Sequence, residues 1–245
     1  MPTLWQWSLD TDGTPDRRAV HALLSEWLDT DHHTSSKPWS WSPADAGGIP
    51  ALWIGLVDDT LVERLLDRSA AYHRSKQRRD APPLTQPLRQ VAATTWAQLA
   101  AARPEHSGRW RLRFATPVTF RRGDRFMPWP APAPVFGSLR TTWRTHAAPH
   151  VGDLCLDLSL DPLVVTGIDG ASHTERVPLR KPNGNRTDRR PVEVTVNGFL
   201  GTITYTADGP LDTAAVESLT RLAPYCGVGS YTTRGFGAVR TPTRP

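Results

Sequence analysis

Short apolar segments alternate with two amphipathic stretches in the first half of the chain. In Asp16–Leu28 the apolar residues recur every three or four positions, which predicts one buried helix face, and Thr14-Pro15 is typical of a helix start. Thr60–His73 shows the same spacing. Three shorter segments predict strands: Leu4–Leu9, Trp39–Ser42 and Leu52–Val57. Trp39 and Trp41 alternate with serines, so we expect only one face of their strand to be buried.

The second half repeats this order. The pattern predicts strands at Trp110–Phe120, Leu154–Val165, Val192–Tyr205 and Ala238–Arg240, and helices at Val135–His146 and Asp212–Leu222. A basic, turn-rich segment is expected over His173–Arg190, and the periodicity of Val91–Ala101 leaves strand and helix open. Each half thus approximates strand, helix, two strands, helix, strand, which is the split βαβ plan. The expected fold class is α+β: tandem ferredoxin-like (RRM-like) domains, residues 1–106 and 107–245, with a C-terminal glycine-rich loop.

Composition excludes several classes of protein. The longest apolar run, Ala51–Val57, has seven residues, whereas a membrane-spanning helix needs about 20. The first residues show no secretory signal pattern, so we expect a cytoplasmic protein without a membrane partner. The two cysteines, Cys155 and Cys226, form no CxxC motif, which argues against a disulfide scaffold or a zinc finger.

The charge balance is basic, with 29 Lys and Arg against 24 Asp and Glu. Only Lys37, Lys76 and Lys181 are lysines, so arginine dominates. Arginine suits forked contacts to phosphate and stacking on bases, although a GC-rich genome alone favours arginine codons. The charge is therefore compatible with a nucleic-acid ligand without establishing one.

The segment from Tyr225 to Gly237 carries the most chemical information. Its glycines permit close backbone approach, and consecutive amides there can form a concave anion site. The sequence lacks the Gly-Lys-Ser/Thr ending of a phosphate-binding P-loop, and a helix precedes it, which is the reverse of a dinucleotide fingerprint. A tight helix-to-strand turn is the structural alternative. The expected ligand-binding residues of this loop are Gly227, Gly229, Ser230, Tyr231, Thr232, Thr233, Arg234, Gly235 and Gly237.

The motif GVGSYTTRGFGAVR resembles the C-terminal glycine-rich loop of the CRISPR-associated RAMP superfamily. The resemblance is closest to the endoribonucleases that process CRISPR precursor RNA, the sixth Cas family. Phe114–Phe120, Pro132–Leu139 and Gly198–Gly201 resemble further family segments in the same order, so the similarity covers most of residues 110–241. In the first half, Lys37-Pro-Trp-Ser-Trp-Ser resembles the family's lysine, aromatic and serine pattern.

The resemblance implies cleavage of repeat RNA without a metal or another cofactor. The ribose 2′-OH attacks the neighbouring phosphate and leaves a 2′,3′-cyclic phosphate and a 5′-OH. The implied partner is CRISPR repeat RNA, as a hairpin or single strand, with no role for DNA; homodimer formation and association with effector-complex subunits stay open. One alternative is a non-catalytic RNA-binding RAMP subunit of an effector complex. Another is an unrelated RNA-binding domain pair whose glycine loop is only a turn.

The resemblance also indicates candidate residues. His32 and His33 occupy the loop where the family carries its catalytic histidine, with His33 slightly favoured and His21 as a second candidate. Lys37 takes the position of a charge-stabilising lysine, while Ser25 stands nearest to where the family often offers a tyrosine. Candidate phosphate-gripping arginines are those after the Trp110 strand and those beside Trp143: Arg121, Arg122, Arg125, Arg140 and Arg144. A solvated charged surface is the alternative for each.

Overall fold

The N-terminal half folds around a four-stranded antiparallel sheet. The computed structural model describes residues 1–9, 16–29, 36–74, 87–103, 108–155, 157–180 and 192–240. Its first six elements are β1 (Thr3–Ser8), α1 (Arg17–Leu28), β2 (Trp39–Asp45), β3 (Pro50–Leu56), α2 (Thr60–Arg74) and β4 (Arg89–Ala93). The strands lie in the order β2-β3-β1-β4, which is the ferredoxin-like arrangement.

The C-terminal half repeats this arrangement. The sheet has the order β10-β5-β9-β8, and a small hairpin, β6-β7, stands beside it. The elements are α3 (Trp96–Ala100), β5 (Arg109–Val118), β6 (Phe120–Arg122), β7 (Arg125–Met127), α4 (Pro132–Thr142), a π-helical turn (Trp143–Ala147), α5 (Ala148–Val151), β8 (Leu163–Arg180), β9 (Val192–Ala207), α6 (Thr213–Cys226), a 3₁₀ turn (Thr232–Arg234) and β10 (Val239–Arg240). The expected tandem ferredoxin-like fold is confirmed. The proposed boundary between residues 106 and 107 lies in 104–107, outside the described residues.

Several of the predicted helix ends differ from those observed. Asp16 caps α1, because its side chain accepts a hydrogen bond from the Arg18 amide at 2.9 Å, while Thr14 and Pro15 lie outside the described residues. The helix expected to run to His146 changes at Trp143 into a π-helical turn. Trp143 is fully buried and donates from Nε1 to the Gly152 carbonyl. Its ring therefore belongs to the core and offers no surface for stacking.

The strand expected at Leu154–Val165 is wrong over most of its length. Asp153 and Ser159 form local turns with the amides of Cys155 and Asp161, and β8 begins only at Leu163. The strand then continues to Arg180, through half of the segment expected to be turn-rich, because β9 pairs with it throughout. Val91–Ala101 holds both a strand and a helix. β4 ends at Ala93, and a capping box between Thr95 and Gln98 starts α3.

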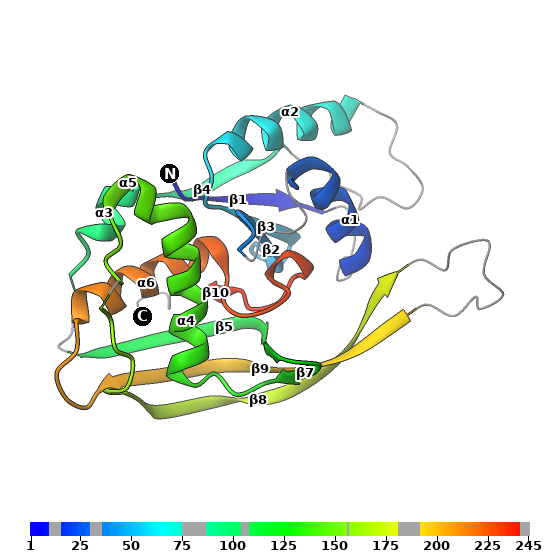
Figure 1. Ribbon diagram of the computed structural model, residues 1–245. Helices are drawn as coiled ribbons and strands as arrows, with labels where there is room; N and C mark the ends of the chain where they lie inside the picture. Colours follow the sequence, from blue (N-terminus) through cyan, green and yellow to red (C-terminus); the bar gives the residue numbers. More distant parts are fainter. Residues whose placement is uncertain are drawn as a thin grey trace.

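Helix α6 lies between the two sheets and joins the domains (Figure 1). The helices α1 and α2 cover one face of the N-terminal sheet, and Trp39 and Trp41 pack in that core. Ser40 and Ser42 on the other face of β2 are also buried, so the expectation of one buried face is wrong. Ser40 donates to the Tyr225 carbonyl at 3.4 Å, and Arg240 donates to Ser42 at 3.0 Å. The partner domain covers the face that the sequence leaves polar.

The domains approach each other closely at Gly55 on β3. A Cβ atom there would stand 2.1 Å from the Tyr225 carbonyl oxygen at the end of α6. That end continues four residues past the predicted Leu222, through Pro224 to Cys226. Glycine at position 55 is therefore what lets the helix touch the sheet.

We expect Gly55→Ala to destabilise the protein by more than about 2 kcal/mol, because the added methyl must push α6 off the sheet. Urea unfolding measures the loss. Ser40→Ala is the matched control, since it removes one weak interdomain hydrogen bond without adding volume and should cost less than about 1 kcal/mol. Equal stabilities of the two variants would contradict this account of the domain contact.

Candidate active site

The glycine-rich loop, residues 227–237, closes on itself between the two domains. It leaves α6, passes β2 and α1, and returns as β10 (Figure 1). The Val228 amide donates to the Gly237 carbonyl at 2.9 Å, which pins the base of the loop. A Cβ at Gly237 would lie 1.9 Å from the Val228 oxygen, and one at Gly229 would lie 2.4 Å from the Thr119 oxygen. These glycines are required by the packing of the loop itself.

The loop amides largely serve the fold, which corrects the expectation of an anion site built from consecutive amides. Gly229 donates to the Ser138 hydroxyl at 2.9 Å, Ser230 to the Thr119 carbonyl at 2.8 Å, and Gly237 to the Pro117 carbonyl at 2.9 Å. Phe236 donates to the Tyr231 carbonyl at 3.2 Å. An anion at these positions would have to displace protein acceptors. The chemistry that the loop offers must come from its side chains.

The N-terminal domain binds the tip of the loop through hydrogen bonds. The Thr233 carbonyl oxygen lies 2.7 Å from His21 Nδ1 and accepts a second hydrogen bond from Trp41 Nε1 at 2.8 Å. Arg17 donates to the Gly235 carbonyl at 2.7 Å, and its guanidinium lies over the Phe236 ring at 4.8 Å. Two carbonyls of the C-terminal domain are thus held by α1 and β2.

This contact determines the chemical state of His21. A carbonyl oxygen can only accept, so Nδ1 must carry the proton, and the neutral ring keeps a lone pair on Nε2. Burial lowers the pKa of His21, and the charge of Arg234 acts in the same direction, while the hydrogen bond to Thr233 opposes them. His21 is therefore held as a neutral imidazole with Nε2 available as a base.

Lys37 and Arg234 bring positive charge to the same place. Arg234 directly follows Thr233, the residue whose carbonyl contacts His21, and the charges of Arg234 and Lys37 both lower the pKa of His21. Lys37 Nζ lies 3.6 Å from the Asp29 carboxylate, and this carboxylate also accepts from Trp39 Nε1 at 2.8 Å. The Trp39 ring stacks on His21 with centroids 6.1 Å apart. The predicted residues Lys37, His21 and Arg234 thus form one interdomain cluster.

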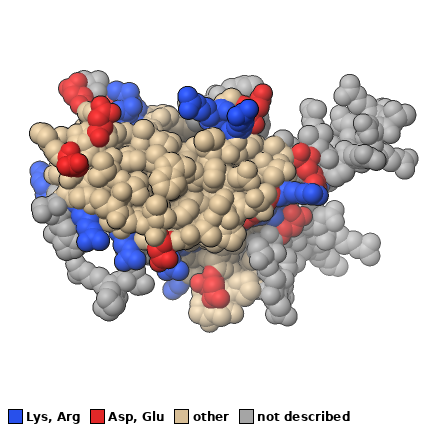
Figure 2. All heavy atoms as spheres, turned by 90° about the horizontal axis from the view of Figure 1, so that it is seen from below, with Lys and Arg blue, Asp and Glu red and all other residues tan. Residues whose placement is uncertain are grey.

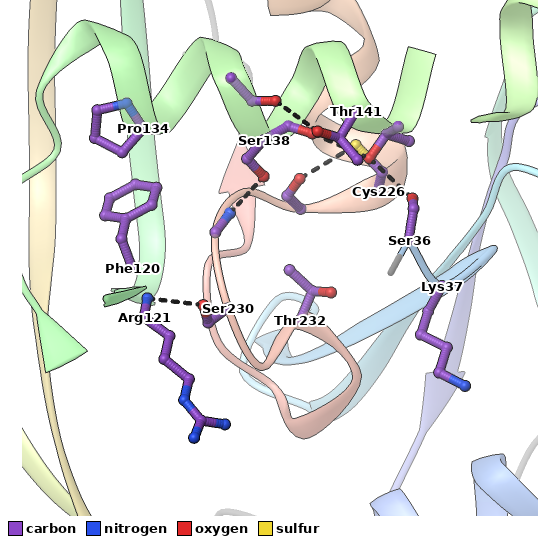
Figure 3. Close-up of a pocket in the computed structure, with 14 residues that line it drawn as sticks. Ser36, Lys37, Phe120, Arg121, Pro134, Ser138, Thr141, Cys226, Ser230 and Thr232 are labelled. Carbon is purple, nitrogen blue, oxygen red and sulfur yellow. Dashed lines mark hydrogen bonds between the residues drawn. The ribbon is translucent and has the colours of Figure 1, made fainter. Parts of the chain in front are cut away.

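Beside this cluster, a cleft of about 380 Å³ opens between the loop and α4. Hydroxyl side chains and glycines line most of it, and none of its fourteen lining residues is acidic. Figure 3 shows Lys37 and Arg121 on opposite sides of the loop, both extending away from α4. Ser138, which the sequence did not single out, binds the loop from α4. No sequence pattern marks it, because its partner is 91 positions away.

Other predicted residues are scattered. His32 and His33 lie outside the described residues. Arg121, Arg122 and Arg125 are exposed on the β6-β7 hairpin, where Arg121 lies 3.6 Å from Asp124. Arg144 pairs with Asp153 at 2.8 Å, and Arg140 donates to the Leu158 carbonyl.

In the loop, Tyr231 packs against Phe126 and Phe236, so its ring is already partly covered by protein. Thr232 lines the cleft, as do Gly227, Gly229 and Ser230. Arg17 and Trp41 are binding partners of the loop that sequence reasoning missed, and only the tertiary contact reveals them.

The helix-free side of the C-terminal sheet carries a row of arginines on β5. Arg109, Arg111 and Arg113 alternate with the buried Trp110, Leu112 and Phe114 and are exposed, each opposite a threonine of β9. Figure 2 shows this side with basic and acidic residues interspersed towards its margins and a broad uncharged area across the centre. The described part of this face therefore carries charges of both signs along its edges.

The described ranges contain neither a candidate metal site nor a candidate membrane-spanning helix. Within those ranges, no three or more His, Cys, Asp or Glu side chains gather as a group that could hold a metal ion. No helix among the described residues is long and apolar enough to cross a membrane.

Comparison with known proteins identifies a family. Residues 112–239 match the family described as CRISPR-associated endoribonuclease Cas6. A curated protein of that name from Mycobacterium tuberculosis (strain CDC 1551 / Oshkosh) is 29% identical over 158 residues, which are 62% of this chain. The matched region spans 45% of that relative, so the chain corresponds to less than half of its length.

Solved structures show the same fold over nearly the whole chain. A Cas6 (TTHA0078) product complex aligns with a TM-score of 0.76 at 23% identity, covering 99% of both chains. Thermus thermophilus Cas6 (TTHB231) aligns with a TM-score of 0.68 at 23% identity, covering 98% of this chain and 97% of that one. The likeness therefore extends through both ferredoxin-like domains.

We expect NMR titration to find the pKa of His21 below 6.5, with the proton on Nδ1 in the neutral form. The resonance is assigned by its loss in His21→Gln. Because the fold favours the neutral ring, the contribution of His21 to stability is present above pH 6.5 and is lost as the pH falls through the lowered pKa. The fall in unfolding temperature between about pH 7.5 and pH 5 should be smaller in His21→Gln. A pKa above 6.5 or an Nε2-protonated neutral ring would contradict the contact with Thr233.

Proposed function

The chain belongs to the family of CRISPR-associated Cas6 endoribonucleases, and we propose that it cleaves CRISPR repeat RNA in precursor transcripts to release guide RNAs. The observation that supports this activity best is the interdomain cluster of His21, Lys37 and Arg234 beside the glycine-rich loop. It joins a neutral imidazole to two cations, which suits proton transfer at a phosphate. The site of action would be the cytoplasm, where the transcripts are made.

The reaction is a transesterification that needs no metal ion. A base takes the proton of the ribose 2′-OH as its oxygen attacks the adjacent phosphorus. The bond from phosphorus to the 5′-oxygen breaks, and an acid protonates that oxygen. The products are a 2′,3′-cyclic phosphate and a 5′-OH end. Because the substrate supplies the nucleophile, the protein needs no activated serine or cysteine.

The described residues suit distinct roles in this step. His21 would act as the base, since its Nδ1 proton is held by Thr233 and its lowered pKa keeps Nε2 unprotonated at neutral pH. Lys37 and Arg234 would stabilise the negative charge that grows on the phosphate oxygens. One of His32 and His33, which precede Lys37 in the sequence, would supply the acid.

Binding of the repeat would draw on side chains around the loop and on the neighbouring hairpin. Arg121, Arg122 and Arg125 form an exposed basic group on β6-β7. Arg140 and Arg144 are engaged by Leu158 and Asp153, so we assign them a smaller part. Repeat RNA, as hairpin or single strand, is the proposed partner, and effector-complex subunits or a second copy of the chain could join it.

The function is tested by incubating the protein with labelled repeat RNA in excess EDTA. A parallel RNA carries one 2′-deoxy nucleotide at the mapped cut. We expect cleavage in EDTA that the deoxy substitution abolishes, because the attacking hydroxyl is then absent. Binding without cleavage would instead identify a non-catalytic RNA-binding subunit. Failure to prefer repeat RNA over random RNA would contradict a role in CRISPR processing.

Substitution of the histidines tests the assignment of roles. We expect His21→Gln, and His33→Ala or His32→Ala, each to slow cleavage by about 100-fold or more, with repeat affinity changed less than about threefold. Single-turnover rates and fluorescence anisotropy measure the two quantities. His173→Gln is the control, since His173 is exposed on β8 and should behave like the unmodified chain. Unchanged cleavage in all three test variants would overturn the proposed residues.

A further inference from the structure

Gly137 in the middle of α4 has no structural explanation among the described residues. A Cβ atom at this position would meet nothing within 4 Å. The backbone there is ordinary α-helix, where glycine costs about 1 kcal/mol relative to alanine. By contrast, a Cβ at Gly229 or Gly237 would strike protein backbone. Gly137 therefore keeps open a space that the protein itself does not fill.

That space is the cleft between α4 and the glycine-rich loop, because Gly137 is one of its lining residues. The volume of about 380 Å³ falls at the small end of the range for sites that bind small ligands. Two serine hydroxyls border it. Ser138 Oγ accepts from the Gly229 amide and Ser230 Oγ accepts from the Arg121 amide, so each hydroxyl hydrogen is left to donate to another acceptor.

The chemistry of the walls suits one kind of group. The serine hydroxyls are donors, and no lining residue is acidic. Lys37 and Arg121 lie on either side of the loop, each 3.6 Å from a carboxylate outside the cleft, that of Asp29 and that of Asp124, which offsets part of their charge. Phe120 and Pro134 stand together at one end and supply an apolar wall (Figure 3). A donor-rich wall next to an apolar one matches a phosphodiester next to a base.

We propose that this cleft holds one unpaired nucleotide of the substrate RNA. Its phosphate would lie between Ser138 and Ser230, with its ring against Gly137 and the Pro134 end of α4. The cleft is too small to admit a base pair, so the nucleotide must be extruded or single-stranded. Lys37 lines the cleft and lies 3.6 Å from the Asp29 carboxylate, which accepts a hydrogen bond from Trp39 Nε1, and the Trp39 ring stacks on His21. The bound nucleotide would therefore lie close to the proposed catalytic base. The inference rests on the proposed function and specifies where that substrate is gripped.

The test uses substitutions that fill the space without removing a hydrogen bond. Gly137→Ala should raise the unfolding temperature by about 2–4 °C, because alanine favours the helix and meets no neighbour. The same change should weaken binding of repeat RNA. Gly137→Leu should weaken it further, by about tenfold or more, because its side chain occupies the cleft. If Gly137 served only the helix, its substitution would change stability and RNA affinity in the same direction. If the cleft binds a nucleotide, Gly137→Ala raises the stability and lowers the RNA affinity.

Thr145→Leu is the matched control, since Thr145 is exposed on the turn that follows α4 and lies outside the cleft. It should leave RNA affinity within about twofold of the unmodified chain. Repeat RNAs with a single abasic site at successive positions near the cut locate the nucleotide. At one position, the abasic site should lower the affinity of the unmodified chain. The same abasic site should lower the affinity of Gly137→Leu only slightly, because that variant has already lost the contact.

The outcomes separate this inference from the proposed function. If the unmodified chain binds repeat RNA and Gly137→Leu binds it equally well, the cleft is not a nucleotide site, although repeat binding stands. If the chain binds only a short uridine oligonucleotide and Gly137→Leu weakens that binding, the cleft is supported and the repeat-processing function is contradicted. If the chain binds neither RNA, both are overturned.

Discussion

The Thr233 carbonyl oxygen is the point on which the candidate active site depends. It belongs to the C-terminal domain and accepts hydrogen bonds from His21 and Trp41 of the N-terminal domain. Because both donors contact the same oxygen, the N-terminal domain holds the tip of the loop at this point. The contact also selects the Nδ1-protonated form of His21. One backbone carbonyl thus positions the loop and determines the chemical state of its neighbouring base.

Two different sets of polar groups lie on either side of the loop. On one side stands the imidazole of His21, with its pKa lowered mainly by burial. On the other lies the cleft, with hydroxyl donors from Ser138 and Ser230. Lys37 borders both, and Figure 3 shows its side chain beside the loop. The loop amides are mostly bonded to protein, and the loop glycines allow close packing. Side chains from both domains are therefore the groups that the site offers to a ligand.

The two domains are in direct contact at the interface that holds this arrangement. The absence of a side chain at Gly55 lets the end of α6 touch the N-terminal sheet, and Arg240 reaches across to Ser42 and lies 3.5 Å above the Trp53 ring. A guanidinium over an aromatic face is attracted by the ring's quadrupole, and the attraction is stronger when the pair is shielded from water. The buried serines of β2 lie in this contact, which explains why their strand is covered on both faces.

The sequence by itself determined most of the order of the main strands and helices, because the periodicity of apolar residues is local. Amphipathic spacing was enough for α1 and α2, and the motif around the glycine loop was enough to indicate a family. Local signals failed where a distant partner decides: β8 runs through a polar segment because β9 pairs with it, and Trp143 is buried by the fold around it. Only the tertiary structure brought His21, Lys37 and Arg234 together, and only it showed that Gly137 borders a cleft. Such proximity arises from the packing of two domains, and no spacing along the chain encodes it.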